Sequence, residues 1–197
     1  MCKMRNVLAL LLAGVLFAVV VVLFAEQGTG ESAVSIRKSE AQTVLYTVYR
    51  GPYETIGKPI SELYALAAQK KIKICGYLSL VYLNNPYYTS QNDTGQHCLT
   101  EIRIPVGEEA MQQAGSLGEM TDVKKLQSIE VAVMKKQIGQ VDYEAIFRNL
   151  YEQIAKQGYR PADDAAEVFS GDMKSGDYTQ MKSELIVPVR KIEQSKK

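Results

Sequence analysis

Apolar and polar residues alternate in the stretch CLTEIRIPVG, residues 98–107. Successive side chains of a β-strand point to opposite faces, so a period of two separates this stretch into two sets. One set is largely apolar and consists of Thr100, Ile102, Ile104 and Val106. The other set consists of Leu99, Glu101, Arg103 and Pro105. The pattern predicts a strand with one buried face and one charged face.

The same pattern returns near the C-terminus in KSELIVPVRK, residues 182–191. Glu184 aligns with Glu101, and Pro188 aligns with Pro105. If the apolar faces of both strands pack under helices, Glu101 and Arg103 of the first strand and Glu184 and Ile186 of the second lie on the opposite faces. Those faces either meet water or meet each other across a cleft.

The residues before each of these two strands follow a common order. In the first half, strands are predicted at 43–49, 72–83 and 98–106, and helical spacing of Ile56, Ile60, Leu63 and Ala67 predicts a helix within 54–70. Pro59 indicates either a late helix start, with the proline in the first turn, or a kink.

In the second half, strands are predicted at 127–135, 166–170 and 182–191. A helix is predicted over 141–157 from the stripe Tyr143, Phe147, Leu150 and Ile154, and Gly158 ends it. We therefore expect an α+β fold made of a tandem β-α-β-β repeat, with repeat one at 42–107 and repeat two at 127–192. Both helical stripes are expected to be core.

Residues 7–24 are apolar apart from Gly14, and Lys3 and Arg5 precede them. Eighteen residues at a rise of about 1.5 Å span about 27 Å, close to the thickness of a bilayer core. The charges predict a cytoplasmic N-terminus at 1–6, a single membrane span at 7–24 and an extracytoplasmic domain after a linker at 25–41. The alternative is a cleaved signal peptide and a secreted protein.

Net charge is +1, and the basic residues are scattered along the chain. This argues against a nucleic-acid partner, which needs a basic face. His97 is the one histidine and lies in a polar run, so we predict no metal site, no cofactor and no catalytic triad. Cys75 and Cys98 fall at opposite ends of a predicted hairpin and are expected to be buried thiols.

Several motifs together resemble the GyrI-like family of small-molecule-binding domains, also found as effector-binding domains of transcription regulators. The first half carries Gly51-Pro52-Tyr53, Tyr82 with Asn85-Pro86, and the strand from Thr100 to Val106. The second half carries Glu167-Val168-Phe169 and the strand from Ser183 to Val189. The resemblance covers residues 42–192. It implies two β-α-β-β units related by a pseudo-twofold axis, with helices on one side and a ligand cleft on the other.

The resemblance also implies an acidic residue in that cleft, which matches Glu167, with Phe169 as its aromatic neighbour. A carboxylate beside aromatic rings favours amphipathic cations through charge pairing and cation–π contact. Further candidates for lining the cleft, which could equally be core or surface, are Tyr49, Tyr77, Tyr82, Glu101 and Glu130.

The leading hypothesis is a membrane-anchored, non-catalytic domain that binds an amphipathic or cationic small molecule. One alternative is a hydrolase of reactive small molecules with Glu167 as base, as in some relatives of this fold. No paired nucleophile and base is apparent in the sequence to favour it. The other alternative is a protein-interaction module at the membrane that uses the cleft as a peptide groove.

Overall fold

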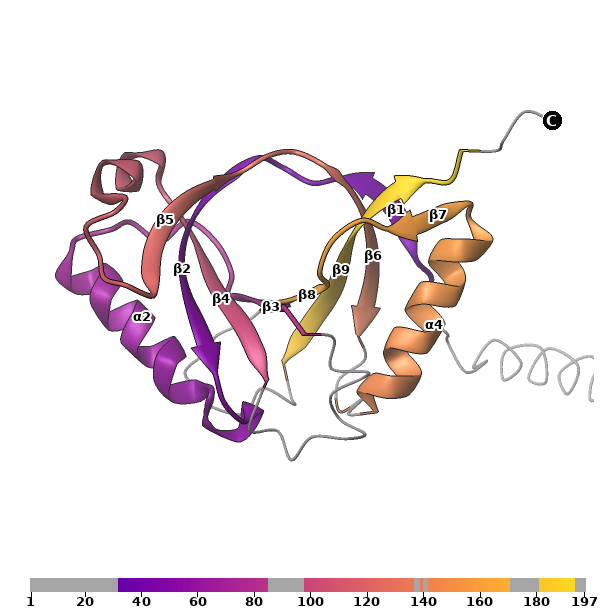
Figure 1. Cartoon of the computed structure of the whole chain (residues 1–197), viewed down its shortest axis with the longest axis horizontal. Helices are drawn as coiled ribbons and strands as arrows, with labels where there is room; N and C mark the ends of the chain where they lie inside the picture. The colour runs from indigo at the N-terminus through magenta and orange to yellow at the C-terminus, as the bar shows by residue number, and fades with distance from the viewer. Residues whose placement is uncertain (1–31, 85–97, 137–138, 140–141, 171–180, 194–197) are drawn as a thin grey trace, which may run out of the picture. The chain divides into compact units, whose positions relative to one another are not determined.

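The sheet of this protein runs through strands from both halves of the chain. The computed structural model describes residues 32–84, 98–136, 139, 142–170 and 181–193. Within them one antiparallel sheet has the strand order β1-β6-β9-β8-β3-β4-β2-β5, and β7 pairs with the far end of β9 (Figure 1). The strands are β1 (Ser35–Lys38), β2 (Gln42–Arg50), β3 (Ser79–Tyr82), β4 (Leu99–Val106), β5 (Thr121–Leu126), β6 (Glu130–Lys136), β7 (Tyr159–Pro161), β8 (Ala166–Ser170) and β9 (Lys182–Lys191).

Within the described residues, two α-helices interrupt the strands at the places that the sequence predicts. Helix α2 (Gly57–Gln69) starts late, with Pro59 in its first turn. Helix α4 (Tyr143–Lys156) begins at Asp142, whose carboxylate accepts a hydrogen bond of 3.0 Å from the amide of Ala145. Gly158 follows α4 with φ +79°, a left-handed conformation that glycine adopts without strain. A short 3₁₀ helix, η1 (Tyr53–Thr55), precedes α2, and a second, η2 (Glu108–Gln113), follows β4.

Both helices lie on the same face of the sheet. A row of cross-strand neighbours identifies the residues that point toward this face. Neighbouring residues on paired strands point to the same side. The row runs through Ile102, Leu80, Glu167, Leu185 and Met134. Its Ile102 end packs in the cluster of α2 and its Leu185 end in the cluster of α4. In Figure 1 the two helices accordingly flank opposite arms of the sheet.

The prediction for which residues lie on the charged second faces is confirmed, but Glu101 is buried there and does not meet water. Because Ile102 and Leu185 face the helices, Glu101, Arg103, Glu184 and Ile186 point to the opposite face. Glu184 there forms an ion pair of 3.1 Å with Arg37 of β1. An open groove of about 480 Å³ lies beside this pair and is also lined by Lys135. This second face also buries four valines, at positions 44, 81, 131 and 133.

Several elements differ from the sequence prediction. Ser35–Lys38, predicted within a linker at 25–41, pairs with β6 as an edge strand. The predicted strand at 72–83 is shorter, because only Ser79–Tyr82 forms a continuous strand, and Ile74 makes an isolated bridge to Val106. Three further elements, η2, β5 and β7, had no predicted counterpart.

The prediction of two buried thiols is wrong for Cys75, which is exposed, and correct for Cys98, which is buried. Cys75 lies between the isolated bridge at Ile74 and the bend at Gly76, before β3 begins, and its side chain is exposed there. Neither of these two cysteines forms a disulfide bond.

The predicted membrane span at 7–24, the residues 1–6 before it and His97 lie outside the described residues. In the part of the chain that the structure describes, no helix has the length and apolar character needed to cross a bilayer.

Truncating the core side of α4 should weaken the fold. Leu150 is fully buried against the sheet. We expect Leu150→Ala to lower the free energy of unfolding by about 2–5 kcal/mol, because the change removes buried methyl groups and leaves a cavity. Glu152→Ala, an exposed position on the same helix, is the control and should change it by less than about 0.5 kcal/mol. Urea unfolding of both variants measures the difference. Equal free energies of unfolding for the two variants would show that Leu150 of α4 is not packed in the core.

Candidate functional site

A carboxylate lies in the middle of the otherwise apolar row that crosses the sheet. Glu167 is the second residue of β8 and is 0% exposed. Its cross-strand neighbours, Leu80 and Leu185, are buried as well. An isolated carboxylate loses its hydration in such a position at a cost of several kcal/mol, so it has to be paired and hydrogen-bonded. The side chains around Glu167 supply those partners.

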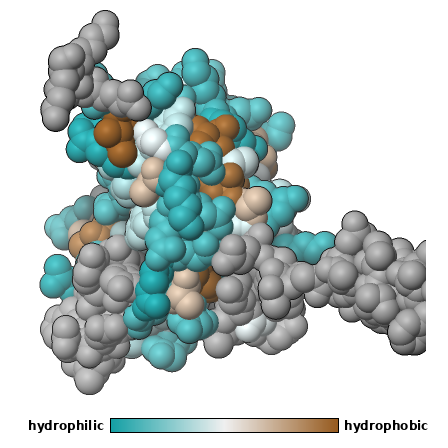
Figure 2. Space-filling model, turned by 90° about the vertical axis from the view of Figure 1, so that its right-hand side faces the viewer, coloured by the Kyte–Doolittle hydropathy of each residue, from teal (hydrophilic) through white to brown (hydrophobic). Residues whose placement is uncertain are grey.

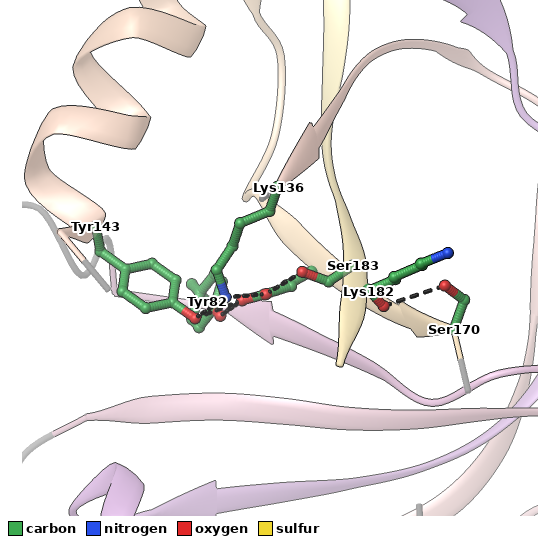
Figure 3. Close-up of polar contacts among 7 residues, drawn as sticks. Tyr82, Lys136, Tyr143, Ser170, Lys182 and Ser183 are labelled. Carbon is green, nitrogen blue, oxygen red and sulfur yellow. Dashed lines mark hydrogen bonds and ion pairs between the residues drawn. The ribbon is translucent and has the colours of Figure 1, made fainter. Parts of the chain in front are cut away.

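Four donors from four different elements bond this carboxylate. Figure 3 shows the side chains of Tyr82, Lys136, Tyr143 and Ser183 converging on one point. The Oε2 atom accepts hydrogen bonds from the hydroxyls of Tyr82 on β3 (2.6 Å) and Tyr143 on α4 (2.8 Å). The Oε1 atom accepts from the ammonium of Lys136 on β6 (2.8 Å) and from the hydroxyl of Ser183 on β9 (2.6 Å). A carboxylate has about four acceptor sites, so all of them are in use. We call these five residues the Glu167 cluster.

The ammonium within the cluster has further partners. Lys136 Nζ donates to the Tyr143 hydroxyl at 2.9 Å and lies 4.8 Å from the centre of the Tyr143 ring. The Lys136 side chain is only 7% exposed. Hydrogen bonds, an opposite charge and an aromatic face therefore all hold the cation in one place.

Aromatic rings form the wall around the cluster. The Tyr82 ring meets the rings of Tyr53, Tyr143 and Phe147 edge to face, with centroids 5.9, 6.4 and 6.0 Å away. Phe147 also stacks on Tyr143 and on Tyr151 along α4. Tyr82 and Phe147 are buried, at 5% and 0% exposure, so these rings pack against one another beside the carboxylate.

Burial and charge shift the titration of the donors. Burial raises the pKa of Tyr82 well above its usual value, and the charge of Glu167 raises it further. The same two causes, in the same order, raise the pKa of Tyr143. Burial alone would lower the pKa of Lys136, but the charge of Glu167 and the hydrogen bonds outweigh it and raise the pKa.

The structure brings only part of the predicted lining set together. It places Glu167 on the helix-covered face rather than in a cleft on the opposite side, where the sequence predicts it. Tyr82 contacts Glu167 directly. Phe169 is buried on the same face, two residues further along β8, in the cluster of α2. The hydroxyl of Tyr49 bonds Thr55 (2.5 Å) and the Pro52 carbonyl (3.1 Å).

The other predicted lining residues do not lie in the Glu167 cluster. Tyr77 is 58% exposed in the segment before β3. Glu130 is exposed at the start of β6, six residues and so about 20 Å from Lys136 along the strand.

Glu101, the remaining candidate, belongs to a separate ion cluster on the opposite face of the sheet. It is 6% exposed. Its carboxylate accepts from the guanidinium of Arg103 and pairs with Lys124 Nζ at 2.7 Å. The Lys124 ammonium also lies 4.2 Å from the ring centre of Tyr46. Two cations from the chain therefore already neutralise this carboxylate.

Sequence reasoning missed three members of the Glu167 cluster. Tyr143 was assigned to the core stripe, Ser183 to the repeated strand motif, and Lys136 to no role. The alternation of β6 contains a usable signal, because Lys136 shares the helix-covered face with Ala132 and Met134. A lysine at the end of an apolar strand face needs an anion nearby. Its cross-strand neighbour is Ser183, one strand away from Glu167.

On the side of the domain that carries α4, the surface is mostly hydrophilic, with hydrophobic side chains in small separate patches (Figure 2). Among the described residues, no group of three or more His, Cys, Asp and Glu side chains could hold a metal ion.

The sequence and fold were compared with those of known proteins. The family model described as the GyrI-like small molecule binding domain matches residues 32–190. A comparison with curated proteins gives no match.

Three solved structures illustrate the fold. The C-terminal domain of EcmrR aligns with a TM-score of 0.67 and 11% identity, over 83% of this chain and 100% of that one. EcmrR in a complex with DNA aligns with a TM-score of 0.68 and 11% identity, over 96% and 68%. A hydrolase from Listeria innocua aligns with a TM-score of 0.58 and 11% identity, over 84% and 96%. At these identities the likeness shows the fold.

The raised pKa values of Tyr82, Tyr143 and Lys136 predict alkaline instability. The folded protein keeps protons on these groups that the unfolded chain releases near pH 10, so the free energy of unfolding falls as pH rises above about 10. Below that pH their contribution is fully present. We expect Tyr82→Phe to reduce this fall by up to about 1.4 kcal/mol per pH unit. Urea unfolding at a series of alkaline pH values measures it. Identical pH dependence in both proteins would contradict the coupling.

Proposed function

This chain belongs to the GyrI-like family of small-molecule-binding domains, and we propose that it binds an amphipathic, cationic small molecule without chemical turnover. The observation that carries the proposal is the fully buried Glu167 carboxylate surrounded by aromatic rings. Burial makes a charge interaction with this carboxylate stronger than it would be in water. A ligand with an apolar body and a positive charge suits both parts of the site.

The proposed site includes residues of both halves of the chain. The half 42–107 supplies Tyr82, and the half 127–192 supplies Lys136, Tyr143, Glu167 and Ser183. We infer that these halves are two copies of one β-α-β-β unit, since β2, α2, β3 and β4 are followed by β6, α4, β8 and β9 in the same order. The pairing of β3 with β8 joins the copies at the site.

Binding is favoured over hydrolysis by the state of the carboxylate. A general base needs a free acceptor site for the proton of water. All four acceptor sites of Glu167 hold protein donors, and both nearby tyrosine hydroxyls donate to it. One of the aligned structures is described as a hydrolase, so turnover of a reactive ester or epoxide by the purified protein is the direct test of that alternative.

The first binding test replaces the carboxylate. The probes are rhodamine 6G, an aromatic cation, and Nile red, a neutral dye, followed by fluorescence anisotropy. We expect Glu167→Gln to weaken rhodamine 6G binding at least about tenfold, equal to about 1.4 kcal/mol, and to affect Nile red less.

Two matched controls accompany this variant. Glu101→Gln changes the buried carboxylate of the opposite sheet face, and Glu130→Gln changes an exposed one. Both should retain rhodamine 6G binding. Unchanged affinity in a folded Glu167→Gln protein would reject the site, and loss in Glu101→Gln alone would move it to the other face.

We also propose that residues 7–24 anchor the domain in a membrane, with residues 1–6 in the cytoplasm and the domain on the other side. The apolar length and the flanking Lys3 and Arg5 support this. We expect the full-length chain to remain in the membrane fraction after an alkaline carbonate wash. Mass spectrometry should find the intact N-terminus. A mature protein that starts near residue 26 would favour the signal peptide.

A further inference from the structure

The cation position of the proposed site is already filled by the chain itself. The Lys136 ammonium lies 2.8 Å from Glu167 Oε1, 2.9 Å from the Tyr143 hydroxyl and 4.8 Å from the Tyr143 ring centre. Its side chain is 7% exposed, and the carboxylate has no acceptor site left. A ligand cation can therefore reach Glu167 only if it replaces one of the four donors.

Lys136 is the donor that a ligand cation can replace most readily. Removal of either tyrosine or of Ser183 by a cation would leave two positive charges beside one carboxylate. Exchange of one ammonium for another keeps the buried site neutral, which a low-dielectric interior strongly favours. The lysine also has a flexible stem of four methylene groups at the end of β6, and it regains full hydration outside the site.

The departure of Lys136 leaves two acceptors without their donor. One is the Oε1 lone pair of Glu167, and the other is the hydroxyl oxygen of Tyr143, which donates its own proton to Oε2. Both are buried or half-buried, and a buried acceptor without a donor is unfavourable. A replacing cation satisfies both acceptors only if one nitrogen carries at least two N–H groups. Rhodamine 6G, with one N–H on each nitrogen, satisfies one of them and still depends on Glu167. Quaternary ammonium and phosphonium ions have no N–H group.

We propose that this site selects primary ammonium ligands, and that Lys136 is an internal competitor which occupies the site in their absence. The inference rests on the proposed function, because it names the ligand class of the same site. The ligand carries an alkylammonium group in the place of the lysine end and an apolar or aromatic body against the half-buried ring of Tyr143. The apparent affinity of the native chain equals the intrinsic affinity multiplied by the fraction of molecules in which Lys136 has left the site.

Chemical rescue tests the inference directly. Lys136→Ala removes the lysine beyond Cβ, and n-propylammonium has the same three carbons and nitrogen as the missing part. We expect Lys136→Ala to unfold at a lower temperature than wild type, and n-propylammonium to raise that temperature saturably. Tetramethylammonium at equal concentration should raise the unfolding temperature of Lys136→Ala no more than sodium chloride does.

Two variants control this experiment. Lys135→Ala alters the adjacent lysine, which points to the opposite sheet face. Neither n-propylammonium nor tetramethylammonium should raise the unfolding temperature of this variant. Lys136→Ala/Glu167→Gln has the same space without the carboxylate and should show no rescue. Equal rescue by tetramethylammonium, or rescue that persists without Glu167, would overturn the inference.

A second variant covers the case in which Lys136→Ala fails to fold. Lys136→Met keeps most of the apolar stem and removes the ammonium group. We expect it to bind 2-phenylethylammonium at least about tenfold more tightly than wild type by calorimetry, because the internal competitor is gone. The affinity for phenyltrimethylammonium should increase by a smaller factor between wild type and Lys136→Met. Equal affinity of wild type and variant for the primary amine would overturn the competition.

The failures of the two proposals can be distinguished. If Glu167→Gln binds rhodamine 6G as well as wild type does, the proposed function is wrong. If that binding depends on Glu167 but the amine experiments show no preference for N–H groups, only the ligand class inferred here is wrong.

Discussion

The burial of one carboxylate constrains the centre of this structure. Glu167 lies at 0% exposure in a row of apolar residues that crosses the sheet. The loss of hydration of such a group exceeds any packing gain unless donors surround it. Strands β3, β6 and β9 and helix α4 each contribute one donor. The end of β6, the start of α4 and the start of β9 therefore have to converge on one point. This requirement constrains how these three elements pack together in the second half of the chain.

Each face of the sheet carries one buried carboxylate, and the two carboxylates are neutralised by different partners. On the helix-covered face, Glu167 has one internal cation and two tyrosine donors. On the opposite face, Glu101 has two cations, Arg103 and Lys124. The aromatic wall belongs to the first face, where Tyr82 and Phe147 meet. A family that binds small molecules needs apolar contact area together with a few polar groups. Of the two buried carboxylates, Glu167 fits that description better.

Strong periodicity made part of the fold predictable. The stripes of α2 and α4, the cap at Gly158 and the faces of β4 and β9 follow from local patterns, because each buries one face against the other elements. Short elements were missed for a physical reason. Ser35–Lys38 is mostly exposed and has few apolar residues, so its strand conformation comes from pairing with β6 rather than from its own sequence.

The site itself was only partly predictable. Glu167 and Tyr82 came from motifs, but their partners Lys136 and Ser183 depend on strand register between segments far apart in the chain. A one-residue shift of β6 would turn Lys136 to the other face. The periodicity that marked Tyr143 as core gives no hint that its hydroxyl reaches a carboxylate. The local sequence thus identifies faces, and the long-range pairing decides which polar groups meet.

The central claim is that the Glu167 carboxylate and the Lys136 ammonium form one neutral buried pair. A double-mutant cycle with Lys136→Met, Glu167→Gln and the double variant measures their coupling most directly, with the free energy of unfolding as readout. We expect the two single changes together to destabilise the fold more than the double change does. The difference, the coupling energy, should be about 2 kcal/mol or more. Additive effects within about 0.5 kcal/mol would show that the two groups do not depend on each other, and would contradict the account.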